Sequence, residues 1–186
     1  MDKYEVLKQY FGYDAFRDGQ EKMIDAITSG RDVLGIMPTG AGKSLCYQIP
    51  ALMAGENGGI TLVISPLISL MKDQVSALNQ AGVHAAYLNS SLTSGQYYKA
   101  LGYAREGRYP IIYVAPERLL TPEFLDFAVY AKIAMVAVDE AHCVSQWGQD
   151  FRPGYLKIEE FLCTLPKRPV VSAFTATATA EVRDDI

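Results

Sequence analysis

The chain has 186 residues, of which 49% are apolar and 20% are charged, and its formal net charge is −4. This length suits one large domain with an ample hydrophobic core, and the composition excludes a disordered chain. The 21 acidic and 17 basic residues do not indicate the broad basic surface typical of nucleic-acid-binding proteins, so any such contact must be local or shared with another domain.

The N-terminus and the cysteines predict a protein of the cell interior. No apolar run approaches the ~18 residues that a membrane span requires, and residues 1–6 lack the layout of a signal peptide. Cys46, Cys143 and Cys163 are odd in number and widely spaced, which argues against disulfides and against a zinc site. We expect three small buried thiols in a reducing compartment, either the bacterial cytoplasm with its nucleoid or the nucleus.

Short apolar runs alternate along the chain with amphipathic stretches of helical length. The expected strands, rich in Val and Ile as strands buried on both faces are, cover residues 33–37, 60–64, 84–88, 111–114, 133–138 and 170–174. The expected helices between them include 67–81, 94–107, 122–130 and 156–165. This alternation predicts an α/β fold with a doubly wound, mostly parallel sheet and helices on both faces. Such sheets bind ligands at the carboxyl ends of their strands.

The first chemical motif, Met-Pro-Thr-Gly-Ala-Gly-Lys-Ser at 37–44, lies between an expected strand and a helical segment. This order forms a phosphate cradle, because glycines turn backbone N–H groups toward an anion at a helix N-terminus. Lys43 would reach the β- and γ-phosphates, and the Ser44 hydroxyl would bind Mg²⁺. The alternative to a phosphate loop is a plain turn that happens to contain Gly-Lys-Ser. The form resembles the nucleotide loop of superfamily 2 helicases, with candidate nucleotide-binding residues Thr39, Gly40, Ala41, Gly42, Lys43 and Ser44.

The second motif is a pair of carboxylates, Asp139 and Glu140, which ends the apolar strand at 133–138. A buried strand that ends in paired carboxylates suits an Mg²⁺-nucleotide site. Asp139 would hold the metal, and Glu140 would orient and deprotonate the attacking water. The alternative is a solvated acidic turn that caps a helix. The position after a buried strand and downstream of a phosphate loop favours the catalytic interpretation.

The third motif follows directly and contains Trp147, the only tryptophan, with Phe151, Arg152 and Tyr155. Two glycines and a proline among these residues predict a loop. Aromatic rings held beside a cation on a loop suit single-stranded nucleic acid, because bases stack on rings at ~1–3 kcal/mol each. Arg152 would meet a phosphate or relay DNA occupancy to the ATP site. The alternative is that Trp147 and Phe151 are ordinary core residues.

These residues together resemble the RecQ family of ATP-dependent DNA helicases. The run Asp-Glu-Ala-His-Cys-Val-Ser-Gln-Trp-Gly-x-Asp-Phe-Arg-Pro at 139–153 is similar to the signature of that family, including its aromatic-rich loop. The resemblance covers the chain from end to end and implies the first RecA-like lobe of the motor, a P-loop NTPase domain. It adds His142 to the catalytic residues and Gln146 to the nucleic-acid-binding ones.

The N-terminal part resembles the adenine-recognition motif of the same family, through Phe-Gly-Tyr-Asp-Ala-Phe-Arg-Asp-Gly-Gln at 11–20. Residues 1–30 would then form an adenine-recognition segment. The resemblance implies that Tyr13 stacks on adenine, Gln20 bonds its N6/N7 edge and Arg17 supports the pocket. A glutamine amide can pair bidentately with adenine. Without the resemblance, Gln20 would be interpreted as an exposed helix residue.

Three further runs at strand ends resemble motifs of the family. Residues 63–74 and 113–119 resemble motifs Ia and Ib, which implies DNA-backbone contacts in exposed turns from Ser65, Pro66, Pro116 and Arg118. Plain connecting turns are the alternative. Residues 172–178 resemble motif III, whose threonines couple hydrolysis to DNA, although hydroxyl residues after a strand are equally good helix caps.

The chain also departs from the family pattern. Asp18, Ala41, Gln149 and Gly154 stand where the family usually has proline, glycine, histidine and glutamate. None of these departures replaces a residue that would bind phosphate, bind the metal or activate water, so we expect the same type of reaction. Gln149 and Gly154 affect the detailed working of the aromatic loop. The second RecA-like lobe, whose arginine finger is worth ~10³–10⁵ in turnover in related reactions, and the C-terminal modules of the family are not among these residues.

The main hypothesis is the first motor lobe of an ATP- and Mg²⁺-dependent DNA helicase. By resemblance, the intact enzyme translocates 3′→5′ on single-stranded DNA and unwinds duplex DNA in repair and recombination, with its second lobe as partner. The lobe alone would bind nucleotide weakly and be largely inactive. One alternative is a self-contained P-loop hydrolase or small-molecule kinase, for which we find no arginine cluster to form a lid. The other is a non-catalytic nucleotide-dependent module, disfavoured because Asp139 and Glu140 are both present.

Overall fold

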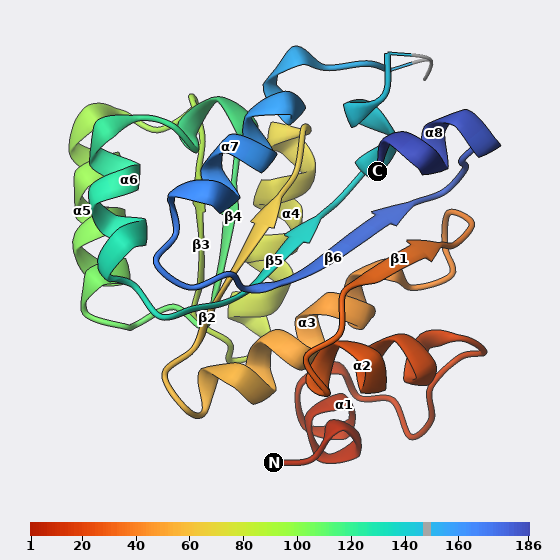
Figure 1. Cartoon of the computed structure of the whole chain (residues 1–186). Coiled ribbons are helices and arrows are strands. Elements are labelled where there is room, and N and C mark those ends of the chain that lie inside the picture. The colour runs from red at the N-terminus through yellow and green to blue at the C-terminus, as the bar shows by residue number, and fades with distance from the viewer. Residues whose placement is uncertain (147–149) are drawn as a thin grey trace.

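A six-stranded sheet forms the centre of the computed structural model, which describes residues 1–146 and 150–186. All neighbouring strands are parallel, in the order β1-β6-β5-β2-β4-β3 (Figure 1). The strands are β1 (Val33–Ile36), β2 (Ile60–Ile64), β3 (Ala85–Leu88), β4 (Ile111–Val114), β5 (Ile133–Val138) and β6 (Val170–Thr175). The predicted parallel α/β sheet is confirmed, with strand bounds that differ from the expected ones by at most one residue at either end.

Helices connect the strands, as a parallel sheet requires. They are α1 (Lys3–Phe11), α2 (Gln20–Thr28), α3 (Lys43–Gly55), α4 (Ile68–Gln80), α5 (Ser94–Arg105), α6 (Pro122–Tyr130), α7 (Lys157–Thr164) and α8 (Ala180–Asp185), with 3₁₀ turns η1 (Pro116–Arg118), η2 (Ala141–Val144) and η3 (Pro153–Leu156). A capping box begins α1, in which the Asp2 carboxylate accepts from the backbone of Tyr4 and Glu5. No helix among the described residues is long and apolar enough to cross a membrane.

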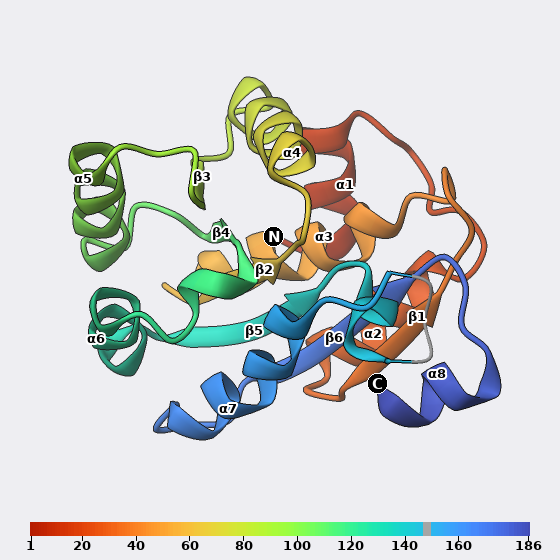
Figure 2. The ribbon, with the colours of Figure 1, turned by 90° about the horizontal axis from the view of Figure 1, so that it is seen from above.

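The two faces of the sheet bury separate hydrophobic cores. Helices α1 to α4 pack on one face, where Val63, Tyr113 and Ala137 point, and α5 to α7 pack on the other face (Figure 2). All five residues of β2 are buried, because successive side chains alternate between the two cores. This arrangement accounts for the strands rich in Val and Ile and leaves the carboxyl ends of the central strands free to carry polar residues.

Two of the three cysteines are buried. Cys46 and Cys143 are buried in the cores, as predicted. Cys163 is exposed, and the prediction of a buried thiol there is wrong. The apolar side chains Ile158, Phe161 and Leu165 define the inward face of the α7 region, and a residue two positions after Phe161 points to the other side of a helix.

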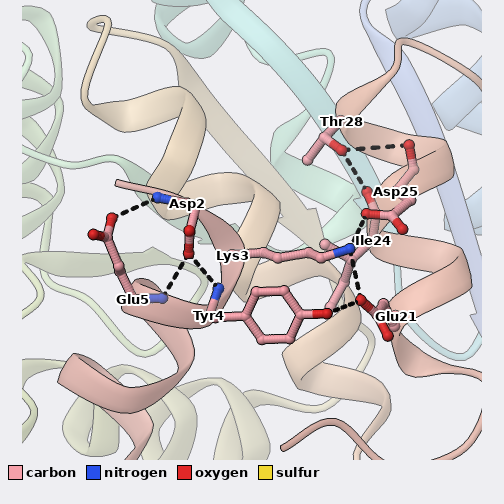
Figure 3. Close-up of polar contacts among 8 residues, drawn as sticks. All are labelled: Asp2, Lys3, Tyr4, Glu5, Glu21, Ile24, Asp25 and Thr28. Atoms are coloured by element: carbon pink, nitrogen blue, oxygen red, sulfur yellow. Dashed lines mark hydrogen bonds and ion pairs between the residues drawn. The ribbon is translucent and has the colours of Figure 1, made fainter.

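A polar network joins α1 to α2 (Figure 3). Lys3 Nζ lies 2.8 Å from Glu21 Oε1 and 2.5 Å from Asp25 Oδ1, and the Tyr4 hydroxyl donates to Glu21. The two carboxylates raise the pKa of Lys3 above its usual value. Since α1 and α2 both pack against α3, these contacts fix the two ends of the connecting segment 12–19, which carries part of the candidate site.

Candidate active site

A cavity of about 680 Å³ brings together residues from four separate parts of the sequence. This volume is within the range of ligand pockets. The predicted site residues in its lining are Tyr13, Arg17, Gln20, Thr39, Gly40, Gly42, Lys43, Ser44, Asp139 and Glu140. Two further predicted residues lie next to the cavity, since Ala41 belongs to the same loop and His142 follows Glu140 by two positions. The sheet therefore places the phosphate loop and the carboxylate pair at one site, as the motif positions predicted.

The loop before α3 has the conformation that an anion site needs. Gly40 and Gly42 have φ of 84° and 80°, a left-handed backbone that favours glycine. Helix α3 begins at Lys43, and in the described part of the chain no backbone hydrogen bond uses the N–H groups of Gly40, Gly42, Lys43 or Ser44. Free amides at a helix N-terminus bind phosphate. A nucleotide phosphate thus fits this loop.

The carbonyl groups of the same loop are held by the N-terminal segment. Arg17 Nη1 donates to Gly40 O at 2.6 Å, and Gln20 Nε2 donates to Ala41 O at 3.2 Å and Gly42 O at 3.1 Å. Gln20 is 1% exposed, so the interpretation as an exposed helix residue is wrong. Its amide hydrogens contact the loop, and its contact with adenine stays a prediction. Nothing in the sequence motif signalled this contact between residues about twenty positions apart.

The two carboxylates differ in burial and in backbone conformation. Asp139 is 7% exposed, so the alternative of a solvated acidic turn is wrong for this residue. Burial, and then the charge of Glu140, raise the pKa of Asp139. Glu140 has a φ of 51°, the one positive φ outside glycine among residues 1–146 and 150–186, and strained backbone of this kind concentrates at functional sites. Its Oε1 lies 3.7 Å from Lys43 Nζ, which joins the two motifs electrostatically.

His142 links the carboxylates to the end of β6. Its Nδ1 lies 2.9 Å from Thr175 Oγ1 and 3.4 Å from Glu140 Oε2. The Thr175 hydroxyl donates to Thr177 O, so its single hydrogen is used and Nδ1 of His142 acts as the donor. Thr179 caps α8 by accepting from Val182 N. Within the run 172–178, Thr175 contacts the carboxylate motif through His142, whereas the cap of α8 is Thr179, one residue after that run. The role of these threonines in coupling hydrolysis to DNA stays a prediction.

The loop after the carboxylates is attached at its end to the residue that follows β5. Tyr155 is 1% exposed and its hydroxyl donates to Asp139 O at 2.7 Å, so this aromatic residue belongs to the core. Gln146 and Arg152 are exposed and Phe151 is partly buried. Trp147 lies outside the described residues, as do positions 148 and 149. Sequence reasoning missed the anchoring role of Tyr155, which follows only from packing between distant segments.

At the base of this loop, Ser145 Oγ donates to Asp185 Oδ2 at 2.6 Å. Ser145 is fully buried. This contact attaches α8 to the segment that follows the carboxylates, and the sequence motif gave no signal for it.

The turns after β2 and β4 are less exposed than predicted. Ser65 and Pro116 are buried, so the expectation of exposed turns is wrong for these two residues. Ser65 extends the pairing of β2 through its N–H to Val114 O, and Pro116 packs beside Gly154. Pro66 and Arg118 are partly exposed. Pro66 O accepts from Arg152 Nη1 at 3.3 Å, so the turn after β2 meets the aromatic segment.

Comparison with known proteins agrees with this geometry. The family model for DEAD/DEAH box helicases matches residues 17–186. The ATP-dependent DNA helicase RecQ of Bacillus subtilis (strain 168) is 53% identical over 182 residues, 97% of this chain and 30% of that protein. The ATP-dependent DNA helicase RecQ of Haemophilus influenzae is 49% identical over 181 residues, 97% of this chain and 29% of that protein. The chain thus spans about 30% of the length of these relatives.

The fold is also found among solved helicase structures. The crystal structure of the DUF1998 helicase MrfA bound to DNA and AMPPNP has a TM-score of 0.77 with 17% sequence identity, and the match covers 100% of this chain and 27% of that one. At this identity the likeness shows the fold alone. The family model and the site geometry carry the assignment: the chain belongs to the DEAD/DEAH box helicase family, and it resembles the RecQ helicases over nearly its whole length.

Proposed function

We propose that this chain is the ATP-binding first motor lobe of a DNA helicase that moves 3′→5′ along single-stranded DNA and unwinds duplexes. One observation carries the proposal: a single cavity is lined by Lys43 and Ser44 of the phosphate loop and by the carboxylates Asp139 and Glu140. These side chains are the set that phosphoryl transfer from ATP requires. The relatives named as ATP-dependent DNA helicases support DNA as the substrate in this proposal. A second lobe of the same protein is proposed as the partner of this one.

Within the cavity, each residue has a defined role in the proposal. Lys43 Nζ would contact the β- and γ-phosphates, while Ser44 and Asp139 would hold Mg²⁺, which when bound neutralises charge on the phosphates. Glu140 would take the proton of the attacking water. No group of three or more His, Cys, Asp or Glu side chains suited to a metal occurs in the described residues. This donor set fits a cation held largely by the nucleotide.

Adenine and DNA would contact different segments of this lobe. Tyr13 and Arg17 of the segment 1–30 line the cavity and are exposed, which suits stacking on a base. Arg152 and Pro66 meet at the turn after β2, where a nucleic-acid backbone would lie. Because the helicase family model covers most of the chain, a self-contained kinase or small-molecule hydrolase is not favoured.

The test is Mg²⁺-dependent nucleotide binding and hydrolysis by the 186-residue chain, with and without single-stranded DNA. Titration calorimetry with AMPPNP is expected to show binding, and phosphate release is expected to be insignificant in both conditions, because the proposed second lobe with its arginine is missing. Absence of AMPPNP binding would contradict the nucleotide site. Robust turnover without DNA would show a catalytically complete hydrolase and would overturn the motor-lobe proposal.

A further inference from the structure

The segment 12–19 joins α1 to α2 and carries Tyr13 and Arg17, two of the residues that line the cavity proposed to bind nucleotide. It contains neither helix nor strand. In the described part of the chain, no hydrogen bond reaches the backbone of residues 13–16. The conformation of this stretch is therefore not fixed by the backbone hydrogen bonds that hold regular elements in place.

Both ends of this segment are glycines. Gly12 has a φ of 72° and Gly19 has a φ of 80°, and no atom lies near the place where a Cβ would stand on either of them. Glycine adopts left-handed and right-handed backbone about equally readily, so these two positions do not restrict the path of the chain between them. Contacts made by side chains of the segment must therefore determine where Tyr13 lies relative to Arg17.

Tyr4 of α1 supplies such a contact in the middle of the segment. Its ring packs against the ring of Phe16, with the centroids 5.3 Å apart and the planes at 52°, and Phe16 is itself packed against the core on this face of the sheet. The Tyr4 hydroxyl donates to Glu21, and Lys3 Nζ lies beside the same carboxylate (Figure 3). Although Tyr4 is 48% exposed, it thus contacts both the segment and the helix that follows it.

The two proposed contacts with the base are held in different ways. Arg17 is attached to the phosphate loop, since its Nη1 donates to Gly40 O at 2.6 Å. Tyr13 is 50% exposed, and the structure shows no hydrogen bond of its side chain to any other described residue. The place of Tyr13 therefore depends on how its neighbours in the segment are anchored.

Two side-chain contacts anchor those neighbours. One is the ion pair of Lys8 with Asp14, whose side chains are 75% and 83% exposed, and an ion pair so exposed contributes little to stability. The other is the packing of Tyr4 on Phe16, which removes apolar ring surface from water and adds the attraction of an aromatic pair. Tyr4 thus provides the stronger of the two anchors.

We propose that Tyr4 is a positioning residue that fixes the place of Tyr13 relative to Arg17 and thereby sets the affinity of the site for the nucleotide base. The inference rests on the proposed function and deepens it, because the base contacts belong to that proposal. Without the Tyr4 ring, the segment also adopts conformations in which Tyr13 is away from the base, and the apparent affinity falls with the fraction of chains that can bind it. The phosphate loop keeps its affinity for phosphate, because Arg17 and Gln20 hold its carbonyl groups without the help of Tyr4.

The test uses Tyr4→Leu, which removes the ring, and Tyr98→Leu as the matched control. Tyr98 lies on α5 and is 54% exposed, its hydroxyl donates to Glu123 Oε1 at 3.3 Å, and its ring contacts the ring of Tyr97 with the centroids 6.0 Å apart. The control therefore removes a tyrosine with the same kinds of contact on the other face of the sheet.

Two ligands separate the base from the phosphates. Calorimetry with Mg²⁺-AMPPNP gives the affinity for the whole nucleotide, and calorimetry with Mg²⁺-tripolyphosphate gives the affinity of the phosphate loop for a ligand without a base. The ratio of the two affinities measures what the nucleoside contributes. A residue that serves stability alone leaves this ratio unchanged in the folded protein. Thermal unfolding by circular dichroism ensures that each variant is folded at the temperature of the titration.

Wild type and Tyr98→Leu are expected to bind AMPPNP more tightly than tripolyphosphate, and by the same factor. Tyr4→Leu is expected to bind AMPPNP ~2–10-fold more weakly, the range that one aromatic pair contributes to an equilibrium constant, with an unchanged affinity for tripolyphosphate. Tyr4→Phe keeps the ring and loses only the contact with Glu21, so its affinity for AMPPNP is expected to fall by a smaller factor.

An unchanged ratio in Tyr4→Leu would overturn the proposal, even if that variant unfolds at a lower temperature, and so would equal losses of affinity for the two ligands. If Tyr4→Leu does not fold, an unchanged ratio in Tyr4→Phe would overturn it. A wild type that binds the two ligands equally well would overturn this inference and leave the phosphate site intact. A wild type that binds neither ligand would overturn the proposed function as well.

Discussion

At the scale of single residues, the candidate site is built from groups that the fold holds at a cost to its stability. Asp139 is buried next to Glu140, and both effects raise its pKa. Glu140 has a left-handed backbone that a residue with a side chain rarely adopts. Neither feature contributes to a stable fold, and both place carboxylate oxygens beside Lys43, where the proposed ATP chemistry needs them.

The pKa of Asp139 leads to a prediction about pH. Because the pKa of the Asp139 carboxyl is raised in the folded state, this group ionises at a lower pH in the unfolded chain than in the folded one. The carboxyl is neutral in both states at low pH, and the fold loses stability as pH rises from the unfolded value of about 3.9 through the higher folded value. We expect Asp139→Asn to raise the free energy of unfolding at pH 7 and to have a smaller effect near the unfolded pKa. Urea titrations at the two pH values measure this difference.

The control for this prediction is Asp73→Asn, which removes one negative charge from an exposed position on α4. A pH-independent effect of Asp139→Asn, or a loss of stability at pH 7, would contradict the argument. Loss of Mg²⁺-dependent AMPPNP binding in the stabilised variant is also expected, since active-site groups commonly exchange stability for function.

At the scale of elements, the phosphate loop is packed against the start of α2. The Gln20 side chain donates to the carbonyls of Ala41 and Gly42, and Arg17 donates to Gly40 O. A Cβ atom on Gly42 would lie 2.4 Å from Gln20 Nε2. Glycine is therefore required at position 42 for two reasons, its φ of 80° and the close approach of α2.

Gly42→Ala and Gly58→Ala separate these two requirements. Gly58 has a similar φ of 72° but has open space around it, so alanine there meets only the left-handed backbone, at a cost of about 1–2 kcal/mol. We expect Gly42→Ala to lower the free energy of unfolding by more than Gly58→Ala does and to weaken AMPPNP binding, because Gln20 must move. Urea unfolding and calorimetry on both variants test this. Equal losses in the free energy of unfolding would show that the Gln20 side chain moves aside without an energetic penalty.

The strands were predictable because their hydrophobic pattern is local. β4 and the last four residues of β5 are buried on both faces and consist of apolar and aromatic residues, and β2 is fully buried with a single threonine. The two nucleotide motifs follow the strands that position them. The exposure of side chains at the strand ends was not predictable. Ser65, Pro116 and Tyr155 are buried because turns from distant parts of the chain pack on one another there, and no periodicity within a single segment records such contacts.

At the scale of the whole molecule, the parallel sheet makes one site from segments that are far apart in sequence. The carboxyl ends of parallel strands meet at one edge, so the loop after β1 and the turn after β5 line the same cavity as Tyr13 and Arg17 of the N-terminal segment. A nucleotide in this cavity would contact all three segments at once. Its binding energy would thus oppose separation of the N-terminal helices from the sheet as well as global unfolding.

This arrangement predicts that Mg²⁺-AMPPNP stabilises the chain against heat and that the effect depends on Lys43. A ligand at 100 times its Kd adds about 2.7 kcal/mol when it binds only the folded state, which corresponds to ~5–11 °C in a domain of this size. We expect Lys43→Ala to unfold near the wild-type temperature without ligand and to lose most of this increase, because the proposed phosphate contact is missing. Lys167→Ala, an exposed lysine before β6, is expected to keep it. An undiminished increase in Lys43→Ala would mean that the nucleotide binds elsewhere, since no other lysine lines the cavity among the described residues.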